Sequence, residues 1–73
     1  MSDEEATILI SHNLRRLRKD LSLAEVARRA NTYPTTIKQI EDGERMPGVG
    51  LLTRIAEAFE VEISEFLMPV KKI

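Results

Sequence analysis

The part of the chain that most constrains its fold is the segment 22–43, which reads SLAEVARRANTYPTTIKQIEDG. Ser22 and Glu25 form a capping-box pattern, in which the hydroxyl accepts from the third N–H of a helix and the carboxylate reaches back. The apolar residues that follow recur at spacings typical of one helical face, and they are Leu23, Val26, Ala27 and Ala30. The segment therefore predicts a short amphipathic helix that begins after Ser22.

A second short helix is predicted after a polar break. Asn31 tolerates the left-handed backbone conformation that ends many helices. Pro34 suits the first position of the next helix, because the missing N–H costs nothing there. Ile37 and Ile40 then face inward, so this helix is predicted over residues 33–42. Two helices this short and this tightly joined cross at a steep angle, which is the helix-turn-helix geometry.

The segment resembles the helix-turn-helix of the lambda-type repressor and Cro (XRE-like) family, whose pattern runs roughly LSQEELAxxAGVSxxTISxIENGxRxPSxxxLxxLAxALGV. The similarity continues through the following loop and helix and covers about residues 10–67. The residues in register are Leu21, Ser22, Glu25, Val26, Ala27, Ala30, Thr36, Ile37, Ile40, Glu41, Gly43, Arg45, Pro47, Leu52, Ile55, Ala56, Ala58 and Val61. The resemblance implies sequence-specific binding of double-stranded DNA by a transcriptional regulator, more specifically a repressor.

The chain is predicted to form one compact all-α domain of five helices. Its 73 residues lie near the lower limit for an unaided hydrophobic core. Residues 1–9 form an acidic start to the first helix, residues 10–67 the helix-turn-helix domain, and residues 68–73 a tail. The apolar patterns in residues 49–59 and 61–67 predict the fourth helix and a short fifth one.

The distribution of charge along the chain supports DNA binding more than the net charge of the whole chain does. Eleven Lys and Arg against twelve Asp and Glu leave a net charge of −1, which by itself argues against nucleic acid. Residues 10–45, however, hold eight basic and five acidic side chains, a net charge of +3 (8 − 5). The motif is therefore the basic part of a slightly acidic chain.

The resemblance implies which side chains read the bases. In the family, exposed positions near the start of the second motif helix contact base edges in the major groove. The matching residues here are Pro34, Thr35, Lys38 and Gln39. Gln39 suits adenine, Thr35 suits a thymine methyl or a polar edge, and Lys38 suits guanine or phosphate.

The residues predicted to contact the DNA backbone are Tyr33, Leu23, Arg45, Arg15 and Arg16. Leu23 stands where the family has a glutamine that donates to a phosphate, so only its backbone N–H and the helix dipole remain for that role. Tyr33 replaces the capping Ser or Thr, and two placements stay open: a phenol that reaches a phosphate, or a ring packed over the turn. A solvated helix surface is the alternative for Arg15.

Arg18 and Glu41 have a structural role by the same resemblance. They match a family pair that braces the first helix against the third. The chain is two residues shorter than the family just after Arg18, so Lys19 and Asp20 lead directly into Leu21. A tighter first turn is therefore expected.

Enzymatic, metal and membrane functions find no support in the sequence. Without cysteine, and with His12 as the one histidine, the chain offers no zinc or thiolate site, and we expect neither metal nor cofactor. His12 has no visible catalytic partner, and there is no phosphate-binding glycine loop. The acidic N-terminus resembles no signal peptide, and no apolar run approaches a membrane span. We expect a non-enzymatic, cytoplasmic protein without a membrane partner.

Double-stranded DNA is the predicted partner, bound by a homodimer because one such domain covers one half-site. The surface around Phe66, Leu67 and the tail to Ile73 is the predicted dimer contact. Two alternatives stay open: a protein-binding module that keeps the scaffold, which the acidic balance favours, and an antitoxin that binds both DNA and a toxin. The polar outer face of residues 35–39 favours DNA, because docking surfaces for proteins more often expose large apolar side chains.

Overall fold

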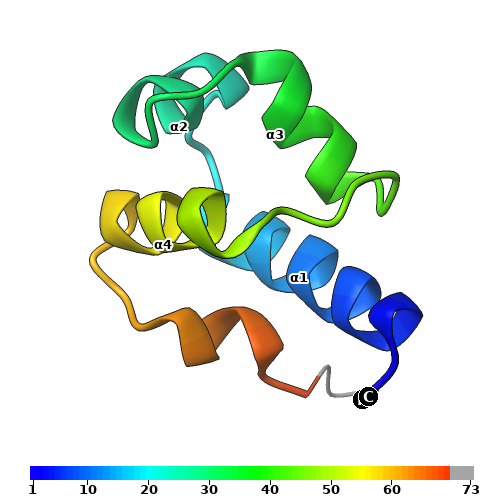
Figure 1. Ribbon diagram of the computed structural model, residues 1–73. Coiled ribbons are helices and arrows are strands. Elements are labelled where there is room, and N and C mark those ends of the chain that lie inside the picture. Colours follow the sequence, from blue (N-terminus) through cyan, green and yellow to red (C-terminus); the bar gives the residue numbers. More distant parts are fainter. Residues whose placement is uncertain (70–73) are drawn as a thin grey trace.

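The computed structural model describes residues 1–69 of the chain (Figure 1). Its elements, in order, are the α-helices α1 (Asp3–Arg18), α2 (Leu23–Arg29), α3 (Pro34–Glu41) and α4 (Val49–Ala58), and the 3₁₀-helix η1 (Ile63–Leu67). The predicted all-α class is confirmed, and no strand occurs in this part of the chain. The fifth element differs from expectation, since its five residues form 3₁₀ turns, a geometry suited to short pieces.

Side-chain caps fix where the first two helices begin. Ser2 Oγ accepts from the Glu5 N–H at 3.1 Å and Glu5 Oε1 accepts from the Ser2 N–H at 3.4 Å, which completes a capping box. At α2, Ser22 Oγ accepts from the Glu25 N–H at 3.0 Å. The expected return bond from Glu25 is absent, because its carboxylate accepts from Arg28 and Arg29 instead.

Three helices end in the same hydrogen-bonded turn, in which the residue after the C-cap has a positive φ. These residues are Asn31 (φ 54°), Gly43 (φ 73°) and Glu60 (φ 57°). In each case the next N–H bonds back to the last turn of its helix, as from Thr32 to the Ala27 carbonyl at 2.9 Å. Asparagine and glycine suit this conformation, whereas a glutamate in it is strained.

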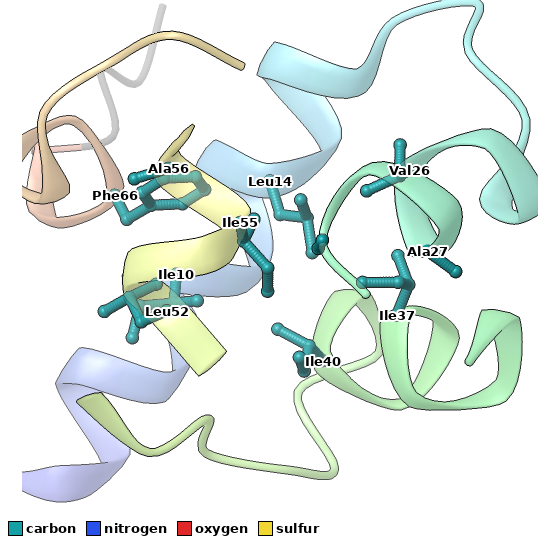
Figure 2. Close-up of a cluster of buried hydrophobic side chains, with 11 residues drawn as sticks. Ile10, Leu14, Val26, Ala27, Ile37, Ile40, Leu52, Ile55, Ala56 and Phe66 are labelled. Carbon is teal, nitrogen blue, oxygen red and sulfur yellow. The ribbon is translucent and has the colours of Figure 1, made fainter. Parts of the chain in front are cut away.

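Every element contributes to one hydrophobic core, in which α1 packs against α3 and η1, and α2 packs against α3 and α4 (Figure 2). The buried apolar side chains are Ile10, Leu14, Val26, Ala27, Ala30, Ile37, Ile40, Leu52, Ile55, Ala56 and Phe66. The residues that α3 contributes to this core, Ile37 and Ile40, lie on one face of the helix, so its other face does not pack against the core. Figure 1 shows α3 and η1 on opposite sides of α1 and α4. No helix within residues 1–69 is long and apolar enough to cross a membrane.

The Phe66 side chain itself is not available for the predicted dimer contact. Its ring is fully buried, with its centroid 6.5 Å from that of Phe59. Asn13 holds this segment against α1, since its Nδ2 donates to the carbonyls of Phe66 at 2.9 Å and Met68 at 3.0 Å. Phe66 completes the core of the protomer because η1 folds back over α1 and α4. Leu67 is half-buried, and residues 70–73 of the predicted contact lie outside the described residues.

Candidate nucleic-acid interface

The two faces of α3 differ in character. Its inward face is buried and consists of Thr36, Ile37, Ile40 and Glu41. Its outward face consists of Pro34, Thr35 and Lys38, which are exposed, and Gln39, which is half-buried. A helix of eight residues held by two fully buried isoleucines presents its other side chains in a fixed direction. The four predicted base-reading residues therefore lie on one accessible surface.

Tyr33 precedes α3 as its N-cap residue, in extended conformation. Within the described residues its side chain makes no capping hydrogen bond, and it is 75% exposed. The alternative in which the ring packs over the turn is therefore wrong. The phenol stands in solvent beside Pro34, which occupies the first position of the helix.

A shallow open hollow of about 480 Å³ joins the outward face of α3 to the start of α2. Its lining residues are Leu23, Pro34, Thr35, Lys38, Gln39 and Glu44. Leu23 is half-buried and packs against the core with part of its side chain. The hollow thus combines the four predicted base-reading residues with one residue predicted to lie near the DNA backbone.

Asp42 neutralises part of the positive charge on this surface. Lys38 Nζ donates to its two carboxylate oxygens at 3.0 and 2.9 Å, and Arg15 Nη2 donates to it at 3.3 Å. The hydrogen bond from Lys38, with the charges of Lys38 and Arg15, lowers the pKa of Asp42. All three side chains are partly exposed, so a phosphate can compete for either cation at small cost.

The surface is braced from behind by Arg18 and Glu41. Arg18 Nη2 donates to Glu41 Oε1 at 2.9 Å, and its Nε donates to the other oxygen of the same carboxylate. Its Nη1 also donates to the Leu21 carbonyl at 2.7 Å, in the turn between α1 and α2. The hydrogen bond to Glu41 raises the pKa of Arg18. This fork ties α3 to α1 at the end of α3 opposite Tyr33.

A family model for the helix-turn-helix, HTH_3, matches residues 14–66. This chain belongs to the HTH_3 helix-turn-helix family. The family predicted from the sequence is thereby confirmed. No curated protein matches this helix-turn-helix chain.

Solved structures share the fold of this helix-turn-helix chain, among them the following two. An HTH_3 family transcriptional regulator from Vibrio cholerae is 33% identical with a TM-score of 0.83, and the match covers 89% of this chain and 38% of that one. The chain therefore spans well under half the length of that regulator. The restriction-modification controller protein C.AhdI from Aeromonas hydrophila is 24% identical with a TM-score of 0.77, over 82% of this chain and 94% of that one.

Arg16 lies apart from the other residues predicted to contact the DNA backbone of a helix-turn-helix protein. Its Nη2 donates to the Glu65 carboxylate at 3.3 Å, and its Nε donates to Asn13 Oδ1 at 3.2 Å. Neighbouring residues of a helix point about 100° apart, so Arg15 turns toward α3 while Arg16 turns toward η1. Arg45 is exposed in the loop that follows α3.

Sequence reasoning missed two residues that shape this helix-turn-helix surface. Asp42 sets its charge, and the four-residue spacing from Lys38 to Asp42 signals that ion pair in the sequence. Arg54 holds the motif from behind, since its Nε donates to the Ala30 carbonyl at the end of α2 at 2.9 Å. No short-range pattern signals the Arg54 contact, because 24 residues separate its partners.

Proposed function

We propose that this helix-turn-helix chain binds double-stranded DNA in a sequence-specific manner, with α3 in the major groove, and acts as a transcriptional repressor. The observation that carries the proposal is the outward face of α3, where Pro34, Thr35, Lys38 and Gln39 share one accessible surface. Membership of the HTH_3 family and the likeness to a transcriptional regulator support it. A bound regulator represses by occupying DNA that the transcription machinery needs.

The side chains of this surface match the chemistry of base edges. The major groove is about 12 Å wide and admits a helix. The Gln39 amide can donate to and accept from adenine, and the Thr35 side chain offers both a methyl and a hydroxyl group. Lys38 can leave Asp42 for a guanine or a phosphate, because an exposed ion pair is worth about 0–1 kcal/mol.

Contacts to the DNA backbone are proposed for residues that flank α3. The Tyr33 phenol stands in solvent at its start, and Arg45 is exposed just beyond its end. Arg15 lies near the C-terminal end of α3, at Asp42. Because few cations are available here, we expect a modest dependence of affinity on salt.

The test compares two single variants on a DNA site selected from a random pool at low salt. Gln39→Ala should lose about 1–3 kcal/mol on the selected site and relax the preference at one base pair. Arg45→Ala should weaken binding to all duplexes about equally and reduce the salt slope by about 1. Arg16→Ala is the matched control for Arg45→Ala, because it removes the same charge from a side chain turned toward η1.

Circular dichroism of the three variants separates these effects from loss of folding. The proposal is wrong if the parent binds selected and random duplexes equally and neither Gln39→Ala nor Arg45→Ala changes the affinity.

A protein-binding role is the second candidate. The pairing of Lys38 and Arg15 with one carboxylate favours it, since it lowers the positive charge of the α3 surface. The net charge of −1 points the same way. The antitoxin hypothesis combines this role with DNA binding. Failure of the DNA test would leave the protein partner, bound at the same α3 surface, as the function to examine.

A further inference from the structure

The hollow beside α3 has an apolar wall where it meets α2. Leu23 is the first residue of α2 and Pro34 the first residue of α3, and the two line the same hollow. Neither side chain can donate or accept a hydrogen bond, and proline also lacks a backbone N–H. Leu23 is half-buried against the core, so its position is fixed before any ligand arrives. The side chains of this corner therefore offer an apolar surface with no group that can pair with a polar base edge.

We propose that this corner recognises the 5-methyl group of a pyrimidine in the major groove. The proposal rests on the proposed function and adds to it the chemical group that is read. The one apolar group that unmodified bases present in the major groove is the C5-methyl of thymine. A polar base edge placed against Leu23 and Pro34 would lose water without gaining a partner, whereas a methyl group loses nothing.

The remaining residues of the hollow can bond to the group next to that methyl. In thymine the neighbour is the acceptor O4, which suits the ammonium group of Lys38 or the amide of Gln39. In 5-methylcytosine the neighbour is the N4 amino group, a donor, which suits the carboxylate of Glu44. Both bases carry the same methyl group, so the hollow fits a 5-methylpyrimidine. The experiment below distinguishes thymine from 5-methylcytosine.

The first measurement uses the parent chain and its selected duplex. Each thymine is replaced in turn by deoxyuridine, which removes only the methyl group, and each cytosine by 5-methylcytosine, which adds one. We expect at least one deoxyuridine to weaken binding about fourfold or more, as for burial of one methyl-sized group. We also expect a 5-methylcytosine at that same position, in place of the thymine, to bind more tightly than cytosine.

The outcomes separate this inference from the proposed function. If the parent binds its site selectively but no methyl removal or addition changes the dissociation constant, the inference is overturned and the proposed function stands. If 5-methylcytosine binds no better than cytosine, recognition of 5-methylpyrimidines in general is overturned in favour of thymine alone. Absence of selective binding overturns the proposed function itself.

A second measurement assigns the effect to Leu23. Leu23→Ala should bring the ratio of thymine to deoxyuridine affinity close to one. Ile63→Ala is the matched control, because Ile63 is also half-buried against the core but lies in η1, and it should keep the parent's ratio. Leu23→Gln retains the approximate size of the side chain and should also lose the methyl preference. It replaces Leu23→Ala in this measurement if Leu23→Ala does not fold. A parental ratio in both folded Leu23 variants would overturn the role of Leu23.

Discussion

The Glu41 carboxylate is buried, and a buried charge needs a cation or hydrogen-bond donors to replace the water it has lost. Its side chain is 4% exposed, and Arg18, which is 25% exposed, supplies two hydrogen bonds to it. Arg18→Met would leave the carboxylate with Arg15 Nε, 4.0 Å away, as its remaining cation among the described residues. Loss of one partner of a buried ion pair costs about 3–5 kcal/mol, so we expect destabilisation of that order in urea unfolding.

The double variant Arg18→Met with Glu41→Leu tests the cause. Without a buried charge to leave unpaired, it should recover much of the stability that Arg18→Met loses. An equal loss in the single and double variants would show that packing of the Arg18 side chain, and not the carboxylate, is responsible.

Glu25 gives the fold a dependence on acid pH. Hydrogen bonds from Arg28 and Arg29 lower its pKa to about 2, from 4.5. Because the folded-state pKa lies below that of the unfolded chain, these ion pairs stabilise the fold above pH 4.5, and the stabilisation is lost as the pH falls toward 2. Glu25→Gln should therefore flatten the pH dependence of the urea midpoint in this range, by a small amount because the pairs are exposed. Identical slopes for parent and variant would contradict this assignment.

At the scale of the elements, the shortened turn between α1 and α2 carries a strained residue. Lys19 caps α1 with φ 50° and ψ −116°, a backbone conformation that favours glycine. This strain follows from joining the two helices with the four residues 19–22. Lys19→Gly should stabilise the domain by about 1 kcal/mol, which corresponds to a rise in Tm of about 4–8 °C in a calorimetric scan.

Two further positive-φ positions serve as comparisons for Lys19→Gly. Asn31→Gly should gain less, because asparagine already tolerates the left-handed region. Glu60→Gly should gain more than Asn31→Gly, since glutamate has no such tolerance. Equal changes in all three variants would contradict the strain explanation, because they would point to an effect on the unfolded chain alone.

At the scale of the whole molecule, size limits how much DNA one domain covers. The domain measures 30 × 24 × 21 Å, less than the roughly 34–36 Å between successive half-sites on one face of DNA. We expect two protomers on one operator with half-sites about one helical turn apart. A footprint of the complex measures the spacing of the half-sites, and sedimentation measures the number of protomers on each duplex. One protein per duplex at saturation would refute the dimer. Because the Phe66 side chain is buried, a dimer contact on this surface would use its neighbours.

The sequence alone determined the local parts of this protein. Helix caps, such as Ser2 with Glu5, join residues a few positions apart, so their spacing shows directly in the chain. The division of α3 into a buried and an exposed face follows from helical periodicity in the same way. The Arg18–Glu41 pair spans 23 residues, and only resemblance to a family made it predictable.

The tertiary structure decided which surfaces meet. It turned Arg15 toward Asp42 and Arg16 toward Glu65, partners 27 and 49 residues away, and it placed Phe66 in the core. The apolar pattern of the last element shows that Phe66 is buried against something, and this pattern is the same for a core and for a dimer contact. Only the packing of η1 onto α1 and α4 distinguishes a core position from a dimer contact. The hydrophobic effect is non-directional, so an apolar pattern does not specify which surface will cover it.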